Sequence, residues 1–361
     1  MLTLLYFILM LGIIIFIHEL GHMLVAKMFG IYVYEFSIGF GPTIWSHQGK
    51  ETKYSIRLIP LGGFTGMVES EETVVDYDKT TSTPTEILNV PVERTFYGAH
   101  PFKRILTLIA GPFFNMLLAM VVFISIFQIT GYVTEYPEPR IEAVAENSPA
   151  AKAGIEAGDL ITKMVYKDGT VIIPETFYDV IVANTSNVDT ITIYVVRNGE
   201  ELSFNVTPVY SEEYQQYMIG ISSPPLIQNE ISFWEAIPIG IEYCFYVISQ
   251  TFMAIINLFK GQGLENLGGT IAIYEYTKEA ASYGFTTLLS LMGSLSVSVG
   301  LMNLIPITIF DGGKIVITLI EWITHKRMSS KTENLVNMIG IAIVFLLFVF
   351  VTIQDLGRAF H

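Results

Sequence analysis

Long apolar runs alternate along the chain with polar segments that are punctuated by glycine. A helix needs about 20 mostly apolar residues to cross the hydrocarbon core of a bilayer. Four stretches approach or exceed this length, at residues 2–26, 105–129, 285–322 and 338–353. Polar residues, proline and glycine within residues 303–313 break the third stretch. The pattern predicts an α-helical polytopic membrane protein with four transmembrane helices.

The segment 236–259 is apolar enough to form a fifth span. Its polar residues fall on one face at 100° per residue, and they are Glu242, Ser249, Gln250 and Asn257. A one-sided polar stripe suits a helix that lies against protein or in the membrane interface. We therefore expect an interfacial helix here, with a membrane crossing as the alternative.

The loop after the first span contains apolar pieces at residues 36–42 and 54–64, each carrying glycine. They are too short to span a bilayer and too apolar for a solvated loop. A β-hairpin that dips into the membrane, shielded by the surrounding helices, accounts for both properties. Residues 69–89 are rich in Thr, Ser and acids, which predicts a mobile linker.

The insert at residues 132–210 has the pattern of a small soluble domain. Alternating stretches at 190–196 and 201–206 flank Asn198-Gly199, which is a strong hairpin signal. The sequence NSPAAKAG (147–154), followed by GDLI (158–161), resembles the PDZ domains of bacterial proteases. Another small β-rich module is the alternative.

These patterns divide the chain into eight parts. They are a first transmembrane helix (1–30), a membrane-reentrant β-hairpin region (31–68), a cytoplasmic linker (69–101), a second transmembrane helix (102–131), a PDZ domain (132–210), an amphipathic or interfacial region (211–284), a third transmembrane segment (285–325), and a fourth transmembrane helix with the C-terminus (326–361).

Composition supports a membrane protein. Hydrophobic residues make up 51% of the chain and charged residues 15%, against about 25% charged in soluble domains. The net charge of −14 leaves no basic face for nucleic acid, so no nucleic-acid partner is expected. The single cysteine, Cys244, excludes an intramolecular disulfide and a Cys-rich zinc site. The apolar run after Met1 lacks a basic n-region and a cleavage site, so we interpret it as a retained span.

Lysine and arginine near the span ends predict the orientation. Basic residues gather between residues 27 and 104 and again between 326 and 331. Both loops are therefore expected to be cytoplasmic, with the insert and both termini outside.

The first apolar stretch contains the sequence HELGH at residues 18–22. On a helix, His18 and His22 share one face and can reach one metal ion, with Glu19 beside it as general base. Each ionisable group inside an apolar span costs about 2.5 kcal/mol or more. Three such groups within five residues are therefore better explained by a metal site than by packing.

A catalytic zinc site needs a third protein ligand. Asp311 is an acid in an apolar stretch beside Gly312 and Gly313, which makes it the better candidate, with a helix-capping acid as the alternative. The remaining histidines lie in predicted loops, at a span end or at the terminus, and they are His47, His100, His325 and His361.

Taken together, these motifs resemble the site-2 protease family, and most closely its regulator-of-sigma-E protease branch. The resemblance rests on HELGH, the PDZ-like insert, GFGP (39–42), PLGGF (60–64), AGPFFN (110–115) and the run 303–313. Proteobacterial members carry two PDZ domains, whereas this insert has room for one.

The resemblance implies roles for individual residues. His18, His22 and Asp311 would ligate one zinc ion per chain, with Glu19 as catalytic base. Asn303 would hold the substrate backbone, or alternatively hydrogen-bond between helices. Gly39, Phe40 and Gly41 would belong to the hairpin that presents the substrate as an added strand. Asn115 would support the site or serve packing.

The resemblance also implies a function, which is intramembrane zinc endopeptidase activity in the bacterial cytoplasmic membrane, with the active site near the cytoplasmic side. Substrates would be single-span membrane proteins, such as anti-sigma factors or remnant signal peptides, cut after their outer part has been trimmed. The PDZ domain, outside the cytoplasm, would bind a peptide C-terminus or restrict substrates by their ectodomain.

Two alternatives compete with this function. A catalytically silent scaffold or receptor would bind peptide ends through the insert, but the presence of Glu19 speaks against it. A transporter built on broken helices is the other, although no inverted repeat is visible in the sequence.

Overall fold

The computed structural model describes residues 2–70, 72–77, 84–185, 189–212, 216–264 and 267–359. The chain forms two compact units. One consists of residues 1–130 and 233–361, and the other is the insert at residues 131–232. Each unit is described separately below.

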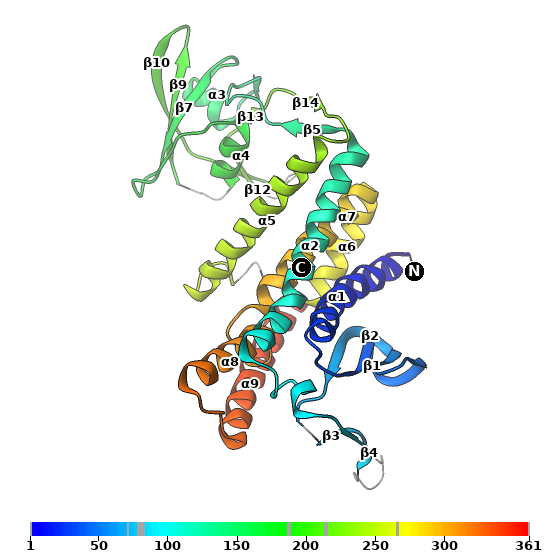
Figure 1. The fold of residues 1–361 in the computed structure, drawn as a ribbon. Helices are drawn as coiled ribbons and strands as arrows, with labels where there is room; N and C mark the ends of the chain where they lie inside the picture. The colour runs from blue at the N-terminus through cyan, green and yellow to red at the C-terminus, as the bar shows by residue number, and fades with distance from the viewer. Residues whose placement is uncertain are drawn as a thin grey trace. The chain divides into compact units, whose positions relative to one another are not determined.

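The first unit is mainly helical (Figure 1). Among the described residues, five of its helices are long and apolar enough to cross a membrane. They are α1 (Leu2–Met28), α2 (Pro101–Thr130), α5 (Ala236–Phe259), α7 (Phe285–Asn303) and α9 (Ser330–Ala359), and the shorter helices are α6 (Thr270–Tyr283) and α8 (Asp311–Thr324). The candidate beyond the predicted four is α5, so its interfacial placement and the count of four spans stay predictions.

Helix α2 contacts α1, α5, α7 and α8. Small residues allow these close approaches. A Cβ on Gly21 of α1 would lie 2.5 Å from the Ala110 carbonyl oxygen of α2, and one on Gly240 of α5 would lie 2.5 Å from Ile124 Cα. Close backbone approach at small residues is a common mode of helix packing in membranes.

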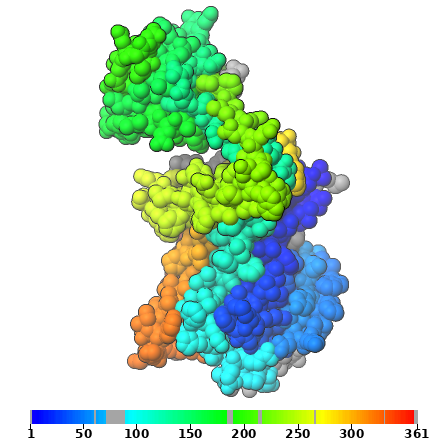
Figure 2. Space-filling view, turned by 45° about the horizontal axis from the view of Figure 1, so that its top comes forward, coloured from blue at the N-terminus to red at the C-terminus, as the bar shows by residue number. Residues whose placement is uncertain are grey.

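Helix α5 packs on α2 through its small residues. Cys244 is fully buried beside Phe123 and Val297, whereas Glu242, Ser249 and Gln250 are exposed. Figure 2 shows α5, in yellow-green, at the surface of the helical unit. The polar stripe seen in the sequence therefore faces away from the packed side of α5.

The third apolar stretch is broken, as its polar and glycine residues predict. Helix α7 ends at Asn303, and α8 begins at Asp311. A Cβ on Gly312 or Gly313 would lie within 2.4 Å of backbone atoms in residues 304–308. The two glycines thus let the connecting loop pack directly on the first turn of α8, which places Asp311 at the start of this helix.

Strands β1 (Val33–Gln48) and β2 (Lys53–Met67) form an antiparallel hairpin beside α1. Residues 35–38 pair with residues 63–66 and also with 53–56, so the hairpin folds back on itself. Its outer part exposes a group of large apolar side chains, namely Phe40, Ile44, Trp45, Ile56, Leu58 and Ile59. Such a surface suits lipid, and insertion of the hairpin into the membrane stays a prediction.

The predicted linker contains secondary structure in its described part. Strand β3 (Glu72–Tyr77) pairs antiparallel with β4 (Pro84–Asn89), and a 3-10 turn, η1, follows at Val92–Arg94. The β-branched residues in the TVV sequence at 73–75 favour an extended backbone. The rest of the expected mobile linker, at residues 71 and 78–83, lies outside the described residues.

The insert is built around a four-stranded sheet in the order β10-β9-β7-β8. Asn198 and Gly199 have positive φ angles and join β9 to β10, so the predicted hairpin is confirmed. The elements of this unit are β5 (Tyr132–Glu135), β6 (Ala143–Val144), α3 (Pro149–Ala153), β7 (Leu160–Val165), β8 (Val171–Ile172), α4 (Phe177–Thr185), β9 (Ile191–Arg197), β10 (Glu200–Val206), β11 (Val209–Ser211), β12 (Gln216–Met218), β13 (Ile221–Ser222) and β14 (Ile227–Glu230).

The insert extends about twenty residues beyond its predicted end at 210. Strand β13 pairs with β6, and β14 pairs with β5, so residues 221–230 return to the start of the unit. Ile219 is part of its buried core. These returning strands have two to four residues, too few to produce a recognisable alternation in the sequence.

Candidate metal centre

Helix α1 brings His18 and His22 together in a buried position. They are four residues apart, so both imidazoles project from one face of the helix. Their Nε2 atoms lie 3.2 Å apart. The two rings are nearly perpendicular, with an interplanar angle of 84°. Both Nε2 atoms therefore point at a common position.

Asp311 reaches the same position from the first turn of α8. Its Oδ2 atom lies 3.2 Å from the Nε2 atom of His18 and 3.2 Å from that of His22. Among the residues that the structure describes, these three form the only group of His, Cys, Asp or Glu arranged to hold a metal ion. Asp311 Oδ2 is buried and makes no hydrogen bond with a described residue.

The donor set fits zinc. Zinc bonds to histidine nitrogen and carboxylate oxygen are about 2.0–2.1 Å long, so a tetrahedral site separates two ligand atoms by about 3.3 Å. The three observed separations are each 3.2 Å. A buried carboxylate oxygen without a hydrogen bond is costly unless a cation compensates it. Spacing and burial thus both favour a bound cation.

Two residues of α2 orient the histidine rings. His22 Nδ1 donates a hydrogen bond of 2.8 Å to the Thr107 carbonyl, which leaves Nε2 free to bind metal. The Asn115 amide nitrogen lies 3.3 Å from His18 Nδ1, while Asn115 Oδ1 is buried and has no hydrogen-bond partner among the described residues. If the Asn115 side-chain amide is rotated by 180°, its Oδ1 accepts a hydrogen bond from a protonated Nδ1 of His18. His18 then has the same tautomer as His22, with the proton on Nδ1 and Nε2 unprotonated.

Glu19 faces the hairpin. The Thr65 hydroxyl on β2 lies 2.9 Å from Glu19 Oε2 and 2.9 Å from the Glu19 backbone carbonyl. A Cβ on Gly63 would lie 3.2 Å from Glu19 Cγ. Residues 63–66 of β2 therefore run directly past the candidate base.

Buried contacts also connect α2 to α8, the helix that carries Asp311. Arg104 forms a 2.9 Å ion pair with Glu321, and both side chains are almost fully buried. The Arg104 guanidinium also lies over the Phe96 and Tyr97 rings, at 5.2 and 5.0 Å from their centroids. This arrangement fixes α8 against the helix that orients the histidines.

The remaining predicted site residues lie in different surroundings. Asn303 Nδ2 donates to the Val299 carbonyl of its own helix at 3.0 Å. Gly39 and Gly41 have positive φ angles, and the Phe40 ring fills the space where a Gly62 side chain would be. No described contact joins these residues to the three ligand candidates, so their substrate roles stay predictions.

The sequence did not indicate Thr65 or Thr107. Thr107 acts through its backbone carbonyl, which residue type does not reveal. Thr65 meets Glu19 only because the hairpin folds onto α1. The one available signal was the position of both threonines in apolar stretches, which is weak.

The helical unit has several helices long and apolar enough to cross a membrane, and it brings together a buried group of two histidines and an aspartate that could hold a metal ion. The family description "Peptidase family M50" matches residues 6–347, and the chain belongs to that family. It is a zinc metalloprotease of the site-2 protease type.

Bacterial relatives match over nearly their whole length. "Probable protease eep" of Enterococcus faecalis is 31% identical, with 99% of each chain covered. "Putative zinc metalloprotease CPE1693" of Clostridium perfringens is 33% identical, with 95% of each covered. A PDZ domain from Listeria monocytogenes is 24% identical over 25% of this chain and 90% of its own, and its TM-score of 0.21 is too low to support a fold assignment.

Proposed function

We propose that His18, His22 and Asp311 hold one zinc ion within the membrane and that Glu19 is the base of an intramembrane endopeptidase. The observation that carries this proposal is the convergence of three ligand atoms, each 3.2 Å from the others, from two helices far apart in the sequence. Three protein ligands leave a fourth position of a tetrahedral site for water or substrate.

His18, His22 and Asp311 would hold the zinc ion, which would supply Lewis acidity to activate water and polarise a carbonyl. Glu19 accepts the proton from the attacking water and delivers it to the leaving amine. The Thr65 hydroxyl donates to the Glu19 carboxylate and fixes its direction. Thr107 and Asn115 keep the histidine Nε2 atoms unprotonated.

The substrate is proposed to be a transmembrane segment of a single-span protein. Its backbone must leave the helical form before hydrolysis, because helical amides are bonded internally. Residues 63–66 border Glu19 and offer a strand onto which an unwound segment can add. Asn303 and the Gly39–Gly41 bend are proposed to help hold that segment.

The insert is proposed to be a single PDZ domain outside the cytoplasm. The sequence motif supports this proposal, and its residues have local structural roles, since Ser148 caps α3, Gly154 ends it in a left-handed conformation, and Asp159 precedes β7. It would bind a peptide C-terminus or restrict substrates by the size of their ectodomain.

In the cell, we place the protein in the bacterial cytoplasmic membrane with its metal centre near the cytoplasmic side. Lysine and arginine flanking the spans support this orientation. There it would cut anti-sigma factors or remnant signal peptides after their outer part has been trimmed.

The experiment is a Glu19→Gln variant of the purified protein, assayed for zinc content and for cleavage of a model transmembrane substrate. Zinc retained with cleavage lost supports the proposal. Glu242→Gln, which changes an exposed acid on α5, serves as the control and should cleave normally. Undiminished cleavage by Glu19→Gln would contradict the assigned base.

A further inference from the structure

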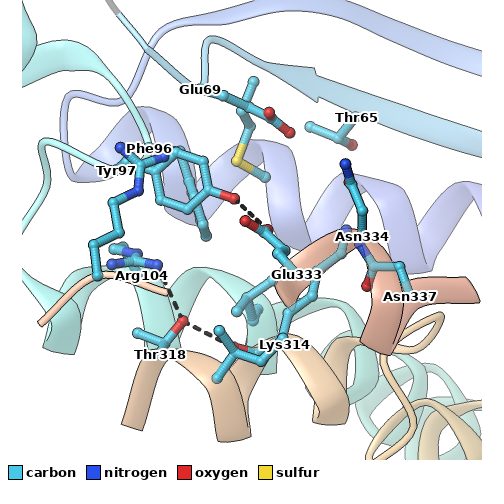
Figure 3. A pocket seen from close by; sticks show the side chains of 14 residues that line it. Thr65, Glu69, Phe96, Tyr97, Arg104, Lys314, Thr318, Glu333, Asn334 and Asn337 are labelled. Atoms are coloured by element: carbon cyan, nitrogen blue, oxygen red, sulfur yellow. Dashed lines mark hydrogen bonds between the residues drawn. The ribbon is translucent and has the colours of Figure 1, made fainter. Parts of the chain in front are cut away.

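A cavity of about 530 Å³ lies beside the metal centre, between β2, residues 96–97, α2, α8 and α9 (Figure 3). Pockets that bind ligands have volumes of about 300–1,000 Å³, so this cavity can hold far more than a few waters. All of its lining residues belong to the helical unit.

Three wall residues adjoin the catalytic groups. Thr65 contacts Glu19 directly. Leu108 follows Thr107, which orients His22. Lys314 lies one turn after Asp311 on α8. The cavity wall thus includes one residue that contacts Glu19 and two that neighbour, along their helices, Thr107 and Asp311.

Most of the charged groups of the wall are already engaged. Arg104 is paired with Glu321. Arg327 lies 3.9 Å from the centroid of the Tyr97 ring, whose hydroxyl donates to Glu333 at 3.0 Å. These contacts link the wall residues of α2, residue 97 and the segment after α8 to one another.

Glu69, another charged residue of the wall, is also engaged in the described part of the chain. Three other polar side chains of the wall are free to bind. The side chains of Asn334 and Asn337, three residues apart on α9, make no hydrogen bond to a described residue. Lys314 has no ion pair in the described part of the chain. Figure 3 shows Asn334 extending towards Thr65 from the opposite wall. The cavity thus offers two carboxamides, each with donors and an acceptor, and one unpaired ammonium.

Carboxamides match the donors and acceptors of a peptide backbone, and an ammonium matches a carboxylate. We propose that this cavity binds the substrate polypeptide on the side of the scissile bond where α1 ends and α8 begins. The chain lies extended along Asn334 and Asn337, with an acidic group against Lys314. This inference rests on the proposed function and names a specificity site for it.

The site predicts a preference that a passage for water would not produce. The relevant substrate position is the one, within a few residues of the scissile bond, that lies in the cavity beside Lys314. A substrate with an acidic residue at this position should be cleaved more efficiently than one with lysine at the same position. The difference should appear in KM, because Lys314 binds the segment and takes no part in proton transfer. A partly exposed ion pair changes kcat/KM by about fivefold.

The test is a charge exchange in the full-length protein. Two model transmembrane substrates, identical except for Glu or Lys at that position, are cleaved by the wild type and by Lys314→Glu. We expect the wild type to favour the Glu substrate about fivefold and Lys314→Glu to favour the Lys substrate. Lys331→Glu, which changes an exposed lysine outside the cavity, should keep the wild-type preference.

The outcomes separate this inference from the proposed function. No cleavage by the wild type would overturn the proposed function itself. Cleavage with the same loss on both substrates in Lys314→Glu would show a structural or water-conducting role and overturn the binding site. A photo-crosslinker replacing Asn334 gives a second measurement, and it should join the substrate segment in a Glu19→Gln background. Absence of that crosslink, with crosslinking intact at a hairpin position, would also overturn it.

Discussion

Gly111 of α2 lies against both histidine rings of the metal centre. A Cβ at this position would lie 2.3 Å from His22 Nε2 and 2.9 Å from His18 Cε1. Neither ring can move away without losing its contact to Thr107 or Asn115. Only glycine leaves room for both histidine rings at this position, although its backbone is an ordinary helix.

We predict that Gly111→Ala weakens zinc binding about tenfold or more, the effect usual when ligand orientation is disturbed. Zinc remaining after dialysis against a competing chelator measures it. Gly12→Ala on α1 is the matched control, since a Cβ there meets nothing within 4 Å. Equal zinc retention by the two variants would argue against the described packing.

The hydrogen bond from Thr65 to Glu19 links the hairpin to the proposed base. Thr65→Val keeps the shape of the side chain but removes the hydroxyl beside Glu19, so we expect kcat to fall about tenfold with zinc content unchanged. Thr65→Ser keeps the hydroxyl and should recover most of the activity. If both variants lose activity equally, the hydroxyl does not position Glu19.

At the scale of elements, the sequence pattern predicted the helices and the hairpin whose formation depends on residues close together in the chain. The apolar runs predicted α1, α2, α7 and α9, and Asn198-Gly199 predicted the hairpin of β9 and β10. The strands at residues 221–230 are not predicted by local sequence, because each has only two to four residues and is stabilised by pairing with residues more than 75 positions earlier. For the same reason, Thr65 was missed while HELGH was found.

The ion pair between Arg104 and Glu321 is an element-scale contact that the sequence could not reveal. Removing one partner of a buried pair leaves an uncompensated charge and costs about 3–5 kcal/mol. We predict this loss for Arg104→Met in denaturant unfolding of the detergent-solubilised protein, with partial recovery in Arg104→Met/Glu321→Gln.

The control for this prediction is the exposed pair of Arg140 with Glu138. Arg140→Met should cost no more than about 1 kcal/mol, because water screens an exposed pair. If Arg104→Met lowers the free energy of unfolding by no more than Arg140→Met does, the buried pair does not stabilise α8 against α2.

At the scale of the whole molecule, each of the two units has a hydrophobic core of its own. In the insert, Arg197 holds the buried Asp159 through two hydrogen bonds of 2.7 Å. Burial alone would raise the pKa of this carboxyl, but Arg197 and the Glu156 amide together lower it below its usual value. The insert therefore contains a stabilising contact that depends on pH.

The sign of this dependence follows from the lowered pKa. An unfolded aspartate titrates near pH 4, so the stabilisation is complete above that pH and is lost as pH falls through the folded pKa. Hydrogen-exchange protection of β7 and β9, corrected for intrinsic rates, should decrease below pH 4 and depend less on pH in Asp159→Asn. Glu201→Gln, at an exposed position, should behave as wild type.

In the proposed metal centre, one zinc ion joins α1 to α8 through His18, His22 and Asp311. Zinc per chain, measured by mass spectrometry on the purified wild type and on Asp311→Asn, tests it most directly. Asp311 is the decisive ligand because the two histidines share one helix. We predict one zinc in the wild type and most of it lost in Asp311→Asn. An Asp311→Asn protein that keeps one zinc per chain would contradict the proposed metal centre.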